Sequence, residues 1–256
     1  MISDDFVKQK NSIWKIDERT IYREYLQWLF LQWFYRQNFS QSMAYFKGGT
    51  ALRLLFGSFR FSEDLDFTCT GTADDIEKVL AEVINSLVKE TGLTINLRDR
   101  KYFADFGLGI RMVFSGLAFK QPLGIRLDFS FREKPLDYEV TIPECQDYPL
   151  SMFPSVFHYS KREILAEKVR AIFARSKVRD IFDLWFLLKN KEEIPWDMIG
   201  EKMKYYPKIE FSKEILSEKV NSVNPKDFAT NLNQFLPINY RGMHQKFLAE
   251  LKNFLL

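Results

Sequence analysis

The chain has 256 residues, of which 46% are hydrophobic and 28% charged, so a disordered or collagen-like chain is excluded. It contains only two cysteines, Cys69 and Cys145, and two histidines, His158 and His244, which disfavours a disulfide framework, an imidazole-rich zinc site and a histidine-based catalytic triad. We therefore expect a reducing, cytoplasmic compartment, and chemistry that relies on carboxylates, lysine, arginine or hydroxyl groups.

The first forty residues predict a helix and no membrane segment. The opening sequence MISDDFVKQK lacks the apolar stretch of a secretory signal. Residues 17–37 carry aromatic and aliphatic side chains at helical spacing and indicate a long amphipathic helix. Its most apolar part is interrupted by Gln27 and Gln32 and falls short of the roughly 20 residues that a bilayer core requires. We expect no membrane partner.

The next hundred residues alternate between strand and helix patterns. An apolar run at 43–46, two glycines and a helical pattern at 51–56 predict a strand, a tight turn and a short helix. Residues 61–68 predict a second strand, and residues 74–91 an amphipathic helix that Gly92 ends. Three further strand patterns follow, at 93–97, 110–114 and 124–131.

The second half of the chain favours helices. Pro143, Pro149 and Pro154 interrupt a stretch that suits neither a helix nor a central strand, which predicts a boundary near residues 142–159, with His158 in a loop. Ser160 and Glu163 then have the spacing of a capping box. The pattern predicts an α+β fold: a mixed sheet with helices at 1–150, including the N-terminal helix, followed by a helical domain at 151–256.

Two glycines form the first candidate site. Residues 47–50, KGGT, connect a predicted strand to a predicted helix. Because Gly48 and Gly49 carry no Cβ, the backbone N–H groups can approach an anion closely at the positive end of the helix. A tight connection without a ligand explains the same residues.

Acidic residues on two predicted strands form the second candidate. Ser62, Asp64 and Asp66 alternate with apolar residues, so they share one face of their strand. Two neighbouring carboxylates repel each other unless cations screen them, and such oxygen ligands suit Mg²⁺. A solvent-facing edge strand is the alternative. Asp128, with Arg126 and Ser130 on its face, becomes a third ligand only if its strand lies beside the first.

The predicted helices after the boundary contain charges among apolar residues. Lys168 falls inside an apolar stripe, and Asp180 and Asp183 lie on a helix that is apolar nearly all round. Buried charges need partners, so either a structural Lys168–Asp183 salt bridge or a role in a site explains them. Residues 161–179 hold seven basic against two acidic residues, a net charge of +5 that favours a binding surface for a polyanion. A basic face that is only solvated is the alternative.

Four motifs follow one another along the chain: residues 47–52 (KGGTAL), 60–67 (RFSEDLDF), 163–168 (EILAEK) and 179–183 (RDIFD). In this order they resemble the AbiEii/AbiGii nucleotidyltransferase toxins of the DNA polymerase β-like superfamily. The resemblance implies that Gly48, Gly49, Thr50 and Ser62 hold the triphosphate and that Asp64 and Asp66 bind metal ions, with Asp128 as the third carboxylate by position. It also implies that Lys168 contacts phosphate and that Asp180 or Asp183 is the last acidic site residue.

The resemblance also implies an activity. We expect a nucleotidyltransferase that uses an NTP and two Mg²⁺ ions, with Mn²⁺ as an alternative, to modify RNA, and tRNA in particular. We expect it to act as the toxin of a toxin–antitoxin or abortive-infection system, with a cognate antitoxin as partner. A small molecule or a protein hydroxyl as acceptor, and a non-catalytic nucleotide- or RNA-binding module, are the alternatives.

Overall fold

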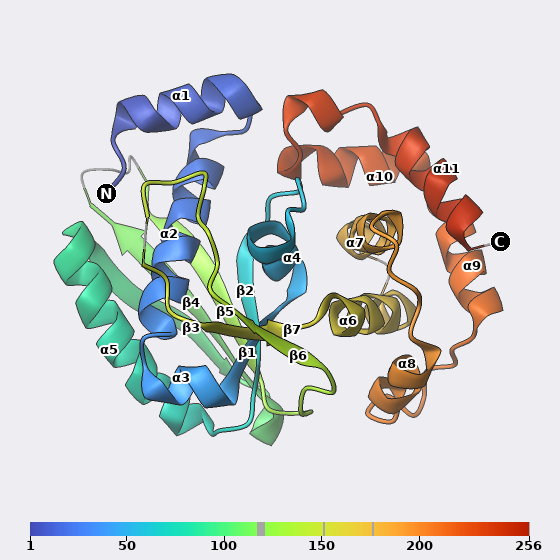
Figure 1. Cartoon of the computed structure of the whole chain (residues 1–256), viewed down its shortest axis with the longest axis horizontal. Coiled ribbons are helices and arrows are strands. Elements are labelled where there is room, and N and C mark those ends of the chain that lie inside the picture. The colour runs from blue at the N-terminus through green and yellow to red at the C-terminus, as the bar shows by residue number, and fades with distance from the viewer. Residues whose placement is uncertain (117–120, 151, 176, 256) are drawn as a thin grey trace. The chain divides into compact units, whose positions relative to one another are not determined.

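The computed structural model describes residues 1–116, 121–150, 152–175 and 177–255. The chain divides into two compact units (Figure 1). Unit 1 comprises Met1–Gly57 and Phe61–Tyr159, and unit 2 comprises Ser58–Arg60 and Ser160–Leu256.

Unit 1 is built on a mixed sheet. In the described residues the sheet has seven strands in the order β3-β4-β5-β2-β1-β7-β6. The strands are β1 (Ala44–Lys47), β2 (Asp64–Cys69), β3 (Thr94–Tyr102), β4 (Gly107–Ser115), β5 (Leu123–Ser130), β6 (Tyr138–Thr141) and β7 (Val156–Tyr159). Because β2 pairs in parallel with β5 and β1 in parallel with β7, while the other neighbours are antiparallel, the predicted mixed sheet is confirmed.

The helices of unit 1 follow the local signals in the sequence. They are α1 (Asp4–Trp14), α2 (Glu18–Phe34), α3 (Asn38–Met43), α4 (Gly48–Phe56) and α5 (Ala73–Thr91). Asp17 caps α2 by accepting a hydrogen bond from the Thr20 amide, and Thr72 with Asp75 forms a capping box at α5. The helix expected over 17–37 is α2, which ends at Phe34.

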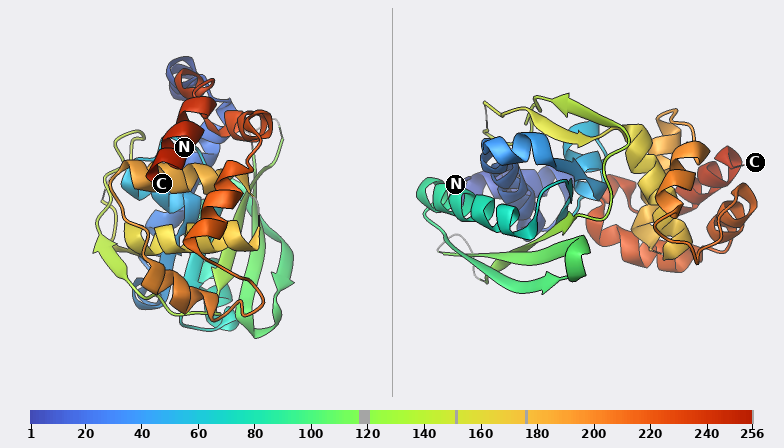
Figure 2. Two further views of the ribbon diagram at one scale, coloured as in Figure 1. Left: turned by 90° about the vertical axis from the view of Figure 1, so that its right-hand side faces the viewer. Right: turned by 90° about the horizontal axis from the view of Figure 1, so that it is seen from below.

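The core of unit 1 lies between the sheet and two helices. Phe30 and Phe34 of α2 contact the rings of Phe67 and Phe129, which face them from β2 and β5. Helices α2 and α5 lie side by side on this face of the sheet (Figures 1 and 2). Since side chains alternate along a strand, the acidic residues of β2 and β5 face away from this aromatic layer.

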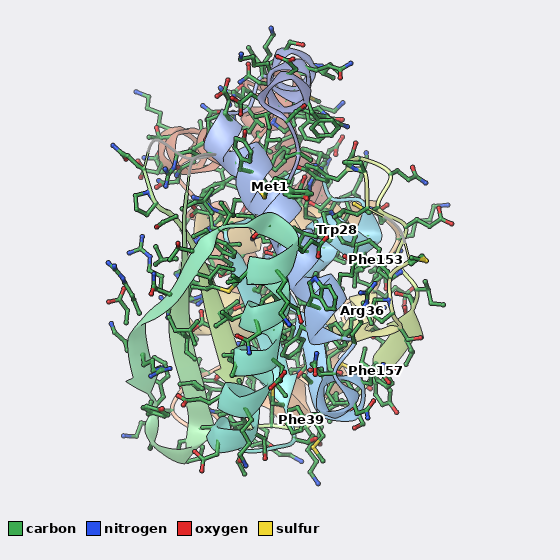
Figure 3. The ribbon with its side chains drawn as sticks, turned by 90° about the vertical axis from the view of Figure 1, so that its left-hand side faces the viewer. Met1, Trp28, Arg36, Phe39, Phe153 and Phe157 are labelled. Atoms are coloured by element: carbon green, nitrogen blue, oxygen red, sulfur yellow. The ribbon has the colours of Figure 1, made fainter. Side chains whose placement is uncertain are left out.

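The proline-rich segment packs against α2 within unit 1. Figure 3 shows Trp28 of α2 beside Phe153, and their ring centroids are 5.0 Å apart. The described residues of the proline-bearing stretch 143–154 lie in neither a helix nor a strand, as expected, and β7 begins directly after it at Val156. His158 lies in β7, fully buried, and not in a loop. Burial lowers its pKa, and its ring nitrogens contact the Tyr159 carbonyl and the Thr141 hydroxyl.

Unit 2 is helical. Its helices are α6 (Lys161–Ala174), α7 (Val178–Lys189), α8 (Trp196–Met203), α9 (Lys213–Asn221), α10 (Pro225–Leu232) and α11 (His244–Phe254) (Figure 2, left). Its aromatic core joins Phe182 and Trp185 of α7 to Phe247 of α11, and Phe59 packs among these rings. Ser160 caps α6 as the sequence predicts. No helix among the described residues of either unit is long and apolar enough to cross a membrane.

Candidate active site

The pairing of the strands brings three carboxylates together on the polar face of unit 1. Asp64 and Asp66 alternate with buried Leu65 and Phe67 along β2. Asp66 is the register partner of Asp128 on β5, so the condition for a third carboxylate is met. Because β2 lies between β5 and β1, the alternative of a solvent-facing edge strand is wrong.

The carboxylates belong to two rows of register partners that cross the sheet: Asp66 and Asp128 lie inside the first row, and Asp64 ends the second. The first row, from β1 to β3, consists of Lys47, Asp66, Asp128, Gly109 and Lys101. The second row, from β2 to β3, consists of Asp64, Arg126, Arg111 and Arg98. Cations therefore flank the acidic centre, and they come from strands that are distant in the sequence.

The glycine turn lies directly against Asp66. Gly48 begins α4 with a φ of +80°, a conformation that side chains other than glycine rarely adopt. A Cβ at this position would collide with the Asp66 carboxylate, so glycine is required for both conformation and space. The buried Thr50 hydroxyl donates to the backbone carbonyl of Asp64. The start of α4 and the start of β2 are thereby held together.

Arg126 binds Asp128 through both carboxylate oxygens. Its Nε lies 2.8 Å from Oδ2, and its Nη2 donates to Oδ1 over 3.1 Å. The hydrogen bond and the charge of Asp128 raise the pKa of Arg126, and Asp64 and Asp66 add to this effect. Arg126 thus acts as a counterion of the acidic centre.

The acidic centre has the donor chemistry that Mg²⁺ prefers but not a complete set of ligands. Across the described ranges, no three or more Asp, Glu, His or Cys side chains are placed so that they could hold a metal ion. The carboxylates of Asp64, Asp66 and Asp128 are hard oxygen ligands, and Mg²⁺ usually takes one or two of these together with phosphate oxygens and water. These residues therefore fit a metal that binds together with its substrate.

A cavity of about 480 Å³ opens beside the acidic centre within unit 1. Asp64 lines it together with the basic side chains of Lys101, Arg111 and Arg126. Ser62, a predicted triphosphate ligand, lies just before β2 and is half-buried, and its carbonyl accepts a hydrogen bond from Nε2 of Gln27. The cavity lies on the β3–β5 side of Asp64, whereas the glycine turn lies on the β1 side of Asp66.

The charged residues predicted on the later helices form a buried ion cluster in unit 2. Lys168 Nζ lies 2.7 Å from Asp183 and 3.1 Å from Asp180. Arg60 contacts both oxygens of Asp183 at 2.8–2.9 Å, and Arg175 Nε lies 3.1 Å from Asp180. The structural salt bridge that the sequence suggested is present, and the participation of Arg60, 123 residues before Asp183, was not foreseen.

Lys168 and Asp180 keep their charges in spite of burial. Burial alone would lower the pKa of Lys168, but Asp183 and Asp180 raise it above its ordinary value. Burial would raise the pKa of Asp180, yet Lys168 and Arg175 lower it to about 2. Asp180 is therefore ionised at neutral pH, and each of the two carboxylates is shared between two cations.

The arginines of the basic segment 161–179 are largely engaged with acidic residues. Arg162 donates to Asp197 at 2.9 Å, Arg170 to Glu167 at 3.3 Å, and Arg175 to Asp180. The net charge of +5 counted along the segment is thus reduced by acidic residues on α7 and α8.

The fold is that of solved nucleotidyltransferases. The structure resembles that of JHP933 from Helicobacter pylori with a TM-score of 0.59 and 22% identity, over 94% of this chain and 91% of that one. It also resembles MenT4, a nucleotidyltransferase toxin from Mycobacterium tuberculosis, with a TM-score of 0.63 and 15% identity, over 100% of this chain and 89% of that one. A search of the curated proteins finds no match.

The sequence also matches a family model over residues 30–255. That family is described as nucleotidyl transferase AbiEii toxin, type IV toxin–antitoxin system. The chain therefore belongs to the AbiEii nucleotidyltransferase toxins, and the resemblance read from its four motifs is confirmed. It is a nucleotidyltransferase of a toxin–antitoxin system, and its family implies an NTP substrate and a cognate antitoxin.

Proposed function

We propose that this toxin transfers a nucleotide from an NTP to a hydroxyl of RNA, with tRNA as the acceptor, in a reaction that depends on divalent metal ions. The observation that carries the proposal is the placement of Asp66 opposite Asp128, with Asp64 two residues away on the same face and Gly48 against the Asp66 carboxylate. The carboxylate oxygens can hold metal ions that bind phosphate oxygens, and the backbone N–H groups at the start of α4 can bind phosphate directly. The two together suit a polyanionic substrate such as an NTP.

Asp64, Asp66 and Asp128 are the residues that would hold the metal ions, Mg²⁺ in the first place. Bound there, the ions would supply charge stabilisation for the oxygens of the reacting phosphate. Gly48, Gly49 and Ser62 would bind the triphosphate, and Thr50 would position Asp64 through its hydrogen bond to the backbone. Arg126 would balance the charge of Asp128 until the substrate binds.

The reaction itself asks little covalent chemistry of the protein. The acceptor oxygen forms a bond to the α-phosphorus while the bond from this phosphorus to the bridging oxygen breaks. Pyrophosphate leaves with the electron pair of that bond, and the hydroxyl proton passes to water. Catalysis would then consist mainly of positioning and electrostatic stabilisation by the residues named above.

The experiment that tests the proposal follows the label of the nucleotide. Each α-labelled NTP is incubated with the toxin, Mg²⁺ and total RNA, and the label is then sought in RNA, in protein and in small molecules. We expect label in RNA of tRNA size, and chelation of the metal should abolish it. If the label enters protein or small molecules instead, RNA is not the acceptor. If the toxin transfers label from none of the NTPs, the proposed activity is refuted.

A further inference from the structure

An arginine row leads across the sheet to the acidic centre. Arg98 of β3, Arg111 of β4 and Arg126 of β5 are successive register partners, and Asp64 of β2 is the next. All three arginines are exposed. Asp99 is the acidic residue beside Arg111, and its contact is loose, at 3.8 Å. The arginine row is therefore a linear array of guanidinium groups that ends at a carboxylate of the candidate active site.

An exposed aromatic ring lies beside the same centre. Phe103, at the turn between β3 and β4, covers two positions of β4 that have no side chain, Gly107 and Gly109. A Cβ added at Gly109 would lie 3.4 Å from the Phe103 ring, 3.1 Å from Oδ1 of Asp128 and 3.9 Å from Nη2 of Arg126. The ring is nevertheless 49% exposed, so it offers a surface for stacking next to the third carboxylate.

The position of the glycine turn indicates which substrate this surface receives. The following step rests on the proposed function. In an in-line transfer the entering and leaving oxygens lie on opposite sides of the phosphorus. If the triphosphate binds at Gly48, on the β1 side of Asp66, then pyrophosphate leaves toward β1 and the acceptor approaches from the β5 and β4 side. That side carries the arginine row, Phe103 and the cavity of about 480 Å³.

We propose that the arginine row and Phe103 form the acceptor site, and that its ligand is an unpaired end of an RNA strand. The guanidinium groups would bind successive phosphates, and Phe103 would stack on the base next to the reacting hydroxyl. Single-stranded nucleic acid is bound by this combination of cations and aromatic rings, whereas a duplex hides the faces of its bases. Arginines pair with acidic residues both in the basic segment 161–179 and in the arginine row, where Arg111 faces Asp99 and Arg126 binds Asp128. The arginine row is the stronger candidate because its register leads directly to Asp64 of the candidate active site.

The test compares two variants at Phe103 that separate stacking from packing. Phe103→Leu keeps an apolar cover over Gly107 and Gly109 but removes the ring, whereas Phe103→Tyr keeps the ring. Binding of a labelled single-stranded RNA oligonucleotide is measured by fluorescence anisotropy, with the same sequence in a duplex as a second ligand. We expect Phe103→Leu to weaken single-strand binding about 5- to 100-fold, and Phe103→Tyr to bind like the wild type.

A second pair of variants tests the arginine row. In the Arg98→Gln/Arg111→Gln double variant, the slope of log affinity against log salt should fall by about 0.7 for each lost phosphate contact. Arg162→Gln is the matched control, because Arg162 is an exposed arginine that pairs with Asp197, and it should leave the slope unchanged. Binding of a non-hydrolysable NTP analogue should be the same in all of these variants, and thermal melting should show that each is folded.

The outcomes separate this proposal from the proposed function. If the wild type labels RNA while Phe103→Leu and the arginine double variant bind it with unchanged affinity and salt slope, the acceptor site is wrong and the proposed function stands. If the wild type binds duplex RNA more tightly than single strands, the ligand class is wrong. If the wild type transfers label only to protein or small molecules, both proposals fail, and this is seen without any variant.

Discussion

Replacement of Lys168 by methionine tests whether the family's motif lysine supports the fold or the substrate. The substitution keeps much of the apolar stem and removes the charge that lies 2.7 Å from Asp183 and 3.1 Å from Asp180. If the lysine acts within the buried cluster, two carboxylates lose a shared cation. If it binds phosphate instead, the loss appears in NTP affinity.

The contacts of Lys168 determine how much unfolding free energy the substitution removes. Removal of one partner of a buried ion pair typically costs about 3–5 kcal/mol, because a charge remains in the interior without compensation. In Lys168→Met, Asp183 would retain Arg60 and Asp180 would retain Arg175, which places the expected loss near 3 kcal/mol. For a chain of this length that unfolds in one cooperative transition, each kcal/mol of lost unfolding free energy lowers the melting midpoint by about 2–4 °C. We therefore expect a decrease of about 6–12 °C.

The assay measures thermal melting and binding of an NTP analogue on the same preparations. Lys202→Met is the matched buried control, since Lys202 pairs with Glu163 and Glu167 in the same unit, and it should lower the midpoint without affecting NTP binding. Lys204→Met is the exposed control, because Lys204 pairs with Glu201 at the surface and such pairs contribute about 0–1 kcal/mol. If the melting midpoint of Lys168→Met lies within 2 °C of the wild type, the loss of unfolding free energy is on the order of 1 kcal/mol or less, and the structural role is refuted. A simultaneous loss of NTP binding would then place Lys168 in the substrate site.

Three further predictions concern the acidic centre and the ion cluster. Asp64→Asn and Asp66→Asn should each lower the transfer rate at least about 100-fold while folding persists, and near wild-type transfer in Mg²⁺ by either variant would contradict the metal assignment. Gly48→Ala should be more damaging to transfer and to stability than Gly57→Ala, because both glycines have a positive φ but only Gly48 abuts Asp66; equal effects on melting and rate would show that the contact is unimportant. Asp180 has a pKa of about 2 in the folded chain against about 3.9 unfolded, so its contribution of about 3 kcal/mol is present above pH ~4 and is lost as the pH falls toward 2. Unfolding free energies measured across that range should fall less steeply in Asp180→Asn, and parallel curves would exclude this linkage.

The sequence predicted those parts of the fold that local signals determine. The helix expected at 74–91 is α5, because a capping box at Thr72 and Asp75 and a glycine at 92 fix its ends. Strands β6 and β7 were not predicted. Each has four residues, and β7 is held by its parallel pairing with β1, more than a hundred residues earlier, which no local pattern can report.

Some features of the candidate site could likewise be predicted from local sequence patterns, and others could not. Alternation along β2 was enough to place Asp64 and Asp66 on one face, whereas the pairing of Asp66 with Asp128 depended on the order of the strands. The Arg126–Asp128 contact could have been suspected, since the two residues are two apart on one strand. The contact of Arg60 with Asp183 could not have been predicted, because it joins a short connecting segment to a helix 123 residues later in the sequence.

Charge is where the linear sequence is the weakest guide to this protein. The segment with the highest positive count, 161–179, has part of its net charge balanced by Asp197 and Asp180, which lie outside it in the sequence, once the chain folds. The arginine row appears in no window of the sequence, because its members come from three different strands. A shift of one residue in the pairing of β4 with β5 would carry Arg111 to the opposite face and interrupt the row. The positive surface beside the carboxylates is therefore a property of strand register, and variants that alter register should change RNA binding even where they change no charge.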